Sequence, residues 1–175
     1  MTPRLKQLTN INIMLETIFN QISLFTDLSP EQIDLLDPIF SLDNFQTEAV
    51  IFEQGAIADY LYIVVVGEVA ICFNPDDGEP LTVSNISQGG VFGWSAAFGT
   101  DTYTSGATCT ADTKILKVLG TDLKKLRQNH PETGILILER LAEVVVKRIK
   151  DSTTQDQIVA LLDHALENGV KPIGG

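Results

Sequence analysis

The chain has 175 residues, of which 44% are hydrophobic, and it carries a formal net charge of −11. This length fits one domain with an appendage, and the hydrophobic content is sufficient for a full core. The negative charge argues against nonspecific binding to nucleic acid or to an anionic membrane surface.

The two cysteines, Cys72 and Cys109, lie far apart in apolar, strand-like segments. We expect them to be small buried hydrophobes in a reducing compartment, with a structural disulfide as the less favoured alternative. Arg4 and Lys6 are not followed by a continuous apolar run, so no signal peptide is expected. The longest apolar run, residues 60–66, is too short to span a bilayer. A soluble cytoplasmic protein is therefore expected.

Two helices are predicted near the N-terminus. Apolar residues recur at helical spacing over residues 9–22 and indicate an amphipathic helix. A second helix begins at Ser29-Pro30-Glu31-Gln32, where Ser29 is the cap and Gln32 completes a capping box. Pro38 requires that helix to end by Asp37, because the residue before a proline is disfavoured in a helix.

From Ile39 onward the hydrophobic period becomes that of strands. The run at residues 60–66 is rich in β-branched and aromatic residues and predicts a buried strand. Asn74-Pro75-Asp76-Asp77-Gly78 predicts a turn. Regularly spaced short strands are typical of a β-sandwich or a small barrel. The other strand candidates are residues 40–45, 50–52, 69–73, 81–86, 105–111 and 114–119.

A glycine-rich segment, residues 89–110, interrupts these strands and contains the only tryptophan, Trp94. Its glycines permit positive φ and a close approach of the chain to a ligand. A short helix that starts near Gly93 would point free N–H groups outward, which suits an anion. On composition alone, the favoured interpretation is a turn and a half-helix that only join two strands.

The last third of the chain is predicted to be helical. A helix capped by Thr121 or Asp122 precedes a long helix from Pro131 to about Asp151, and a final amphipathic helix covers residues 155–168. A helix on the surface of one domain buries an apolar stripe that covers roughly 100° of its circumference. The apolar residues of the long helix cover a wider part of its circumference than this.

This surplus apolar surface predicts a homodimer in which the long helices pair. The alternative is a monomer, in which the final helix folds back over the surplus. The expected interface residues are Leu138, Leu141, Ala142, Val145 and Ile149.

With these elements in order, several motifs resemble the cyclic-nucleotide-binding domain of the catabolite activator protein (CRP/FNR) type. Residues 28–32 look like its entry helix, and residues 55–69 look like its central hairpin. Gly90-Val91-Phe92-Gly93 looks like the start of its phosphate-binding cassette, and His130-Pro131-Glu132 is similar to its break before the C-terminal helix. The resemblance implies a mainly β fold with flanking helices: a double-stranded β-helix (jelly-roll) barrel with N-terminal helices and a long C-terminal helix.

The resemblance also implies how the chain is divided. An N-terminal helix is expected at residues 1–22, the β-barrel at 23–130, a C-terminal dimerisation helix at 131–152, and an extra helix with a tail at 153–175. The implied ligand-binding residues are Gly90, Phe92, Gly93, Trp94, Ser95, Ala96, Thr104, Ser105, Gly106 and Ala107.

Two positions depart from the family pattern. In the family, a glutamate after Phe-Gly holds the ribose 2′-hydroxyl, and here that position is Trp94. An arginine that pairs with the cyclic phosphate begins the strand after the cassette, and here that position is Ser105, or Thr104 if the loop slips by one. Trp94 is expected either to stack on a planar ligand or, in the favoured interpretation, to fill the emptied pocket.

The charge distribution agrees with these departures. No Lys or Arg occurs between Lys6 and Lys114, and that interval holds fifteen acidic residues. Loss of a charge-assisted pair of roughly 1.5–3 kcal/mol would weaken binding by about one to two powers of ten. Backbone N–H groups at residues 93–96 would remain as donors. The basic residues at 114–150 are expected mainly to be solvated faces that complement the barrel.

We therefore expect a non-enzymatic regulatory or sensor module that does not bind cyclic AMP through the usual Glu and Arg chemistry. The alternative is a genuine cyclic-nucleotide receptor that uses backbone donors of the cassette. The expected partners are a small-molecule ligand and a second copy of the chain, with a protein partner left open.

The residues after Ser152 are too few for a winged helix-turn-helix, so no DNA binding is expected. Because His130 and His164 both lie in or beside the C-terminal helices and no strand of the barrel carries a histidine, no metal site or cofactor is expected.

Overall fold

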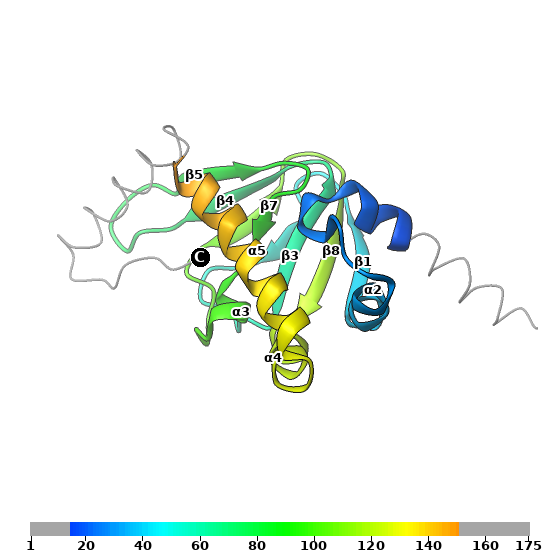
Figure 1. Ribbon diagram of the computed structural model, residues 1–175. Helices are drawn as coiled ribbons and strands as arrows, with labels where there is room; N and C mark the ends of the chain where they lie inside the picture. The colour runs from blue at the N-terminus through cyan, green and yellow to red at the C-terminus, as the bar shows by residue number, and fades with distance from the viewer. Residues whose placement is uncertain (1–14, 151–175) are drawn as a thin grey trace, which may run out of the picture.

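The computed structural model describes residues 15–150 (Figure 1). Residues 15–21 are helical, and the 3-10 turn η1 (Ser23–Phe25) and helix α2 (Pro30–Leu36) follow. The Gln32 N–H donates to the Ser29 hydroxyl oxygen, and the Ser29 N–H donates to the Gln32 side chain. The predicted capping box is thus confirmed.

Eight strands form two antiparallel sheets of four strands each, with the orders β1-β8-β3-β6 and β2-β7-β4-β5. One core cluster contains residues from both sheets and so fills the space between them. This arrangement is the predicted jelly roll. The strands are β1 (Phe40–Phe45), β2 (Val50–Phe52), β3 (Tyr60–Val66), β4 (Val69–Phe73), β5 (Leu81–Ile86), β6 (Val91–Phe92), β7 (Gly106–Cys109) and β8 (Thr113–Leu119).

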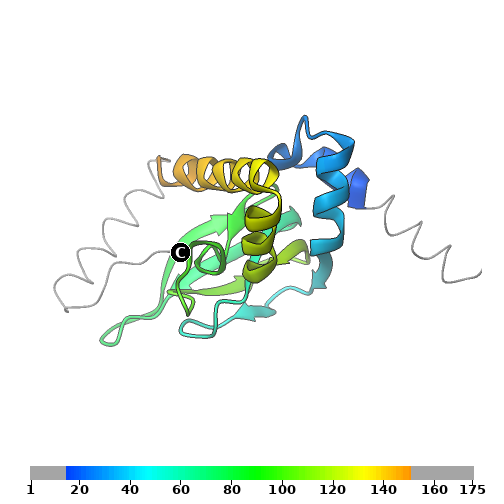
Figure 2. The same cartoon turned by 60° about the horizontal axis from the view of Figure 1, so that its bottom comes forward.

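The helices gather on one side of the strands (Figure 2). The 3-10 turn η2 (Asp37–Ile39) leads into β1, and α4 (Gly120–Asn129) and α5 (Pro131–Lys150) follow β8. A second core cluster lies between these helices and the sheet that contains β3 and β8. Burial of this apolar surface holds α5 on the sheet.

The start of α4 differs from the prediction. Its N-cap is Leu119, whose side chain forms no capping hydrogen bond, so the expected cap at Thr121 or Asp122 was wrong. Strand β8 ends at Leu119 and α4 begins at the next residue, Gly120, whose N–H donates to the Asp59 carbonyl at 2.9 Å. A tertiary contact thus satisfies one of the first four amide groups of the helix, which have no partner within it.

A side chain of α5 joins the two ends of the described chain. Arg140 Nη1 donates to the carbonyl oxygens of Leu24, at 2.9 Å, and of Thr26, at 2.6 Å. Leu24 lies in η1 and Thr26 is its C-cap, so Arg140 links this turn to α5. Both cysteines, Cys72 and Cys109, are free.

The residues expected at a dimer interface fall into different environments. Leu141 has no exposed surface and belongs to the core of its own chain, so it is unavailable to a partner. Leu138 packs against the same core and is partly buried, as are Ala142 and Val145. The side chain of Ile149 and the predicted helix at residues 155–168 lie outside the described part of the chain.

Candidate functional site

The candidate site is the segment of residues 89–105, called the cassette below. It contains β6 and the four-residue helix α3 (Ser95–Phe98). Strand β6 pairs with β3, which places Phe92 opposite Tyr62. This pairing fixes the cassette at the edge of the sheet that also carries α5.

Gly93 allows the chain to turn from β6 into α3. It has a φ of 70°, and a Cβ at this position would lie 2.9 Å from Cδ2 of Tyr62 and 3.0 Å from the Tyr60 carbonyl oxygen. Both the conformation and the space therefore require glycine here. The close neighbour at Gly93 is the chain's own β3.

The second half of the cassette is tied to the loop between β2 and β3. The Gly55 N–H donates to the Tyr103 carbonyl at 2.8 Å, and the Tyr103 N–H donates to the Ala56 carbonyl at 2.9 Å. The Ala58 N–H donates to the Asp101 carbonyl at 3.0 Å. These bonds tie residues 101–103 of the cassette to residues 55–58.

Aromatic rings fill the jelly-roll interior beside the cassette. The rings of Phe52 and Tyr103 stack with their centroids 3.7 Å apart, and those of Tyr62 and Phe92 with theirs 5.1 Å apart. Phe52 also stacks on Tyr62 at 5.6 Å, which joins the two pairs. All four side chains are buried. We call Phe52, Tyr62, Phe92 and Tyr103 the aromatic stack.

Tyr103 anchors this stack by hydrogen bonds to the backbone of β3. Its hydroxyl donates to the Tyr60 carbonyl at 2.6 Å and accepts the Tyr60 N–H at 3.0 Å. Burial raises the pKa of Tyr103, and the nearby carboxylate of Asp59 adds to that effect. Burial likewise raises the pKa of Tyr62, with Tyr103 as the next contributor. Both phenols are therefore neutral hydrogen-bonding groups.

The residues expected to bind a ligand are largely enclosed. Phe92, Ser95, Ser105 and Ala107 have at most 3% of their surface exposed. The Ala96 N–H, expected to remain a free donor, is directed at the Gly93 carbonyl at 3.3 Å. Gly93 is also buried. The others, Gly90, Trp94, Ala96, Thr104 and Gly106, are partly buried.

The sheets contribute two cations, Lys114 and Lys117, both on β8. Lys117 forms an ion pair with Asp43 of β1, and its ammonium lies 4.8 Å from the centre of the Tyr60 ring. Its charge is therefore already engaged by the protein. The position expected for a phosphate-binding arginine holds the buried, neutral Ser105.

Trp94 is not part of the core cluster in the jelly-roll interior, so it does not fill that interior as the favoured interpretation expected. It packs against the core cluster under the helices. The guanidinium carbon of Arg148, on α5, lies 4.4 Å from the centre of its ring, and Arg148 Nη1 donates to the Val91 carbonyl at 2.8 Å. Trp94 Nε1 and Arg148 Nε are buried without a hydrogen-bond partner. Burial lowers the pKa of Arg148 to about 10.

Sequence reasoning thus identified the cassette and missed both the aromatic stack and Arg148. Tyr103 is the only Phe, Trp or Tyr residue after Phe98. An aromatic residue that stands alone in a polar loop was the available sequence signal that this side chain packs against the core. Within residues 15–150, no group of three or more His, Cys, Asp or Glu residues is placed to hold a metal ion. In the same range, no helix is long and apolar enough to cross a membrane.

Comparison with known proteins gives the context for this geometry. The family model of the cyclic nucleotide-binding domain matches residues 42–130, which include the whole cassette. The cyclic AMP receptor protein of Thermus thermophilus is 26% identical over 129 residues. That alignment covers 74% of this chain and 58% of the relative, so the chain spans less than two thirds of the relative's length.

Solved structures share the fold, among them the following two. A protein from Geobacter metallireducens, described as cyclic nucleotide-binding, has a TM-score of 0.65 and 26% identity, and the match covers 73% of this chain and 92% of that one. The regulatory subunit of a cAMP-independent protein kinase A from Trypanosoma brucei, a triple mutant bound to cAMP, has a TM-score of 0.66. At 15% identity, covering 87% of this chain and 52% of that one, it shows the fold alone.

Proposed function

The chain belongs to the cyclic nucleotide-binding domain family, and we propose that it is a non-enzymatic regulatory or sensor module that does not hold cyclic AMP through a glutamate and an arginine. The observation that carries this proposal is the filling of the jelly-roll interior by the aromatic stack. A ligand would have to displace Tyr103, which gives up two hydrogen bonds to Tyr60. Each such bond contributes about 1 kcal/mol.

The electrostatics of the cassette support the same proposal. A cyclic phosphate needs a counter-charge when it leaves water, because burying an unpaired charge is costly. Ser105 supplies none, Lys117 is paired with Asp43, and Arg148 is held against Val91 on the outer side. The alternative, a receptor that relies on backbone donors, is disfavoured by the engagement of the Ala96 amide.

The trypanosomal structure offers a precedent at the level of fold. That protein is described as cAMP-independent, and one of the three substitutions in its cAMP-bound mutant replaces a threonine with an arginine. A regulator with this fold can therefore work without cAMP. The decisive experiment for this chain is calorimetric titration with cyclic AMP and cyclic GMP, on the natural sequence and on cassette variants.

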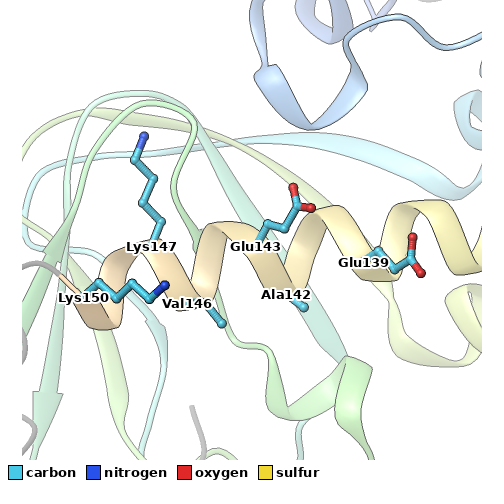
Figure 3. A pocket seen from close by; sticks show the side chains of 6 residues that line it. All are labelled: Glu139, Ala142, Glu143, Val146, Lys147 and Lys150. Carbon is cyan, nitrogen blue, oxygen red and sulfur yellow. The ribbon is translucent and has the colours of Figure 1, made fainter.

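A second copy of this chain is the proposed partner of the exposed face of α5. Ala142 and Val146 point to the same side of the helix (Figure 3), and Val146 is 47% exposed. These two side chains and the charged residues around them line one hollow on the surface of α5. The charged residues are Glu139, Glu143, Lys147 and Lys150.

The charges on this face favour an antiparallel pair of helices. The two glutamates precede the two lysines along α5, so a parallel pair would place like charges opposite each other. An antiparallel, two-fold pair places each acidic end against the basic end of its partner. This apolar seam is narrower than the predicted one, because Leu141 packs into its own chain.

A further inference from the structure

A separate cleft lies between the C-terminal half of α5 and the connection from β5 to β6. It has a volume of about 600 Å³, which is in the range of small-molecule pockets. Residues 85–91 form one wall, α5 forms the other, and Ser23 of η1 also lines it. None of the four side chains of the aromatic stack lines this cleft. It is therefore distinct from the interior in which the family's ligand is expected.

The lining of the cleft is strongly basic. It includes Lys147, Arg148 and Lys150 and no carboxylate. Within the described chain, neither lysine forms an ion pair, in contrast to Lys117 with Asp43. The other polar side chains of the lining are those of Asn85, Ser87, Gln88 and Ser23.

Arg148 distinguishes this cleft from an ordinary solvated basic face. Its guanidinium is fixed by the Val91 carbonyl and the Trp94 ring, and its Nε is buried with no partner. No carboxylate compensates the charge, which is why burial lowers its pKa. A buried cation without a counter-charge is unfavourable, and an anion in the cleft would relieve that cost.

We propose that this cleft binds a small organic phosphate, with Lys147, Arg148 and Lys150 as its counter-charges. Lysine and arginine are the side chains that bind phosphate by charge-assisted hydrogen bonds. Inorganic phosphate would fill only part of the volume, and the amides of Asn85 and Gln88 suit a polar group attached to the phosphate. Larger polyanions such as nucleic acid are disfavoured, because the rest of the chain is strongly acidic.

Trp94 provides a direct readout, because it is the only tryptophan and it stacks on Arg148. Titration of the full chain with ribose 5-phosphate and with inorganic pyrophosphate should change its fluorescence saturably at millimolar concentrations or below. Ribose, which lacks the phosphate, should leave the fluorescence unchanged. Added salt should weaken the binding, because the interaction is between charges.

The double variant Lys147→Gln with Lys150→Gln tests the site without touching the core, since both lysines are exposed. Affinity for ribose 5-phosphate should fall by about tenfold or more. The matched control is Lys124→Gln with Lys125→Gln, which removes two exposed charges from α4 and should leave affinity unchanged. Sedimentation in parallel separates ligand binding from any change in self-association.

Three results would overturn the proposal. The first is the absence of a saturable fluorescence change with both phosphate probes. The second is an equal response to ribose, which would mean that charge is not recognised. The third is an equal loss of affinity in the control variant on α4, which would assign the effect to net charge and not to the cleft.

Discussion

The guanidinium of Arg148 stacks on Trp94 at 4.4 Å, and this contact joins the last turn of α5 to the first residue after Gly93 in the cassette. The hydrogen bond from Arg148 to Val91 reinforces it from the other side of Gly93. A movement of β6 or α3 must therefore displace α5 or break these two contacts. Arg148 thus couples the cassette to the long helix.

Replacing Arg148 with Gln should expose the indole of Trp94, because the stack and the bond to Val91 are lost. Tryptophan emission should therefore shift to the red. Arg127→Gln on α4, an exposed arginine, is the control and should leave the emission unchanged. An unshifted emission spectrum in the Arg148 variant would contradict the contact.

The natural chain should bind cyclic AMP and cyclic GMP more weakly than the low micromolar range near physiological salt. Trp94→Glu with Ser105→Arg should gain little, because Tyr103 still fills the interior and the new glutamate would lie beside Arg148. Adding Tyr103→Ala should raise affinity by about tenfold or more, since it opens the interior to the ligand. Calorimetry measures all three proteins, and circular dichroism checks that each is folded.

The opposite calorimetric result has a clear meaning. A dissociation constant in the low micromolar range or tighter for the natural chain would show that the aromatic stack yields to the nucleotide. The backbone-donor alternative would then replace the proposed function. Binding of phosphate in the cleft beside α5 is measured by Trp94 fluorescence. The calorimetric result for cyclic nucleotides therefore does not decide that proposal.

Stability should decrease at alkaline pH because of Tyr62 and Tyr103. Their folded-state pKa values are raised, so above the unfolded value of about 10 the unfolded chain binds fewer protons than the folded one. The free energy of unfolding therefore falls as pH rises through that range. Arg148, with its pKa lowered to about 10, acts in the opposite direction.

Comparison of the natural chain with Tyr103→Phe isolates the contribution of the Tyr103 hydroxyl to this loss of stability. Urea unfolding between pH about 8 and about 11 should show a shallower alkaline loss in the variant than in the natural chain. At neutral pH the variant should be less stable by about 1–2 kcal/mol, because both backbone groups of Tyr60 lose a buried partner. Parallel pH profiles for the two proteins would show that Tyr103 does not contribute to the alkaline loss.

Self-association should depend on Val146 on the exposed face of α5. Val146→Glu should weaken the dimer by about tenfold or more, because it places a charge in the apolar seam. Ile135→Glu, on the same helix and equally exposed at 47%, should have no effect. Sedimentation at micromolar concentration compares them, and a natural chain of single-chain mass would exclude this interface.

The parts of the fold that depend on neighbouring residues could be predicted from the sequence. The capping box of Ser29 and Gln32 is local, and the strands follow from their own alternation and turns. The cap of α4 was misplaced because the Gly120 amide is bonded to Asp59, which is distant in sequence. Local preference cannot reveal a partner that the tertiary structure supplies.

In the candidate site, too, local features could be predicted from the sequence and tertiary contacts could not. The glycine pattern and Phe92 located the cassette, and Ser105 and Trp94 revealed the missing charges. The position of Trp94 depends on Arg148, and the filling of the interior depends on Phe52 meeting Tyr103 across the jelly roll. Neither pair has a sequence spacing that indicates contact, so the structure was needed to find them.

The two bonds from Arg140 to Leu24 and Thr26 have a consequence for biosynthesis. Their partners are 116 and 114 residues apart in the chain. A chain that emerges from the ribosome N-terminus first must therefore leave these carbonyls to water until α5 has been made. The turn η1, made early in synthesis, is thus completed only by the last described helix, and a nascent chain that stops before Arg140 lacks both of these bonds.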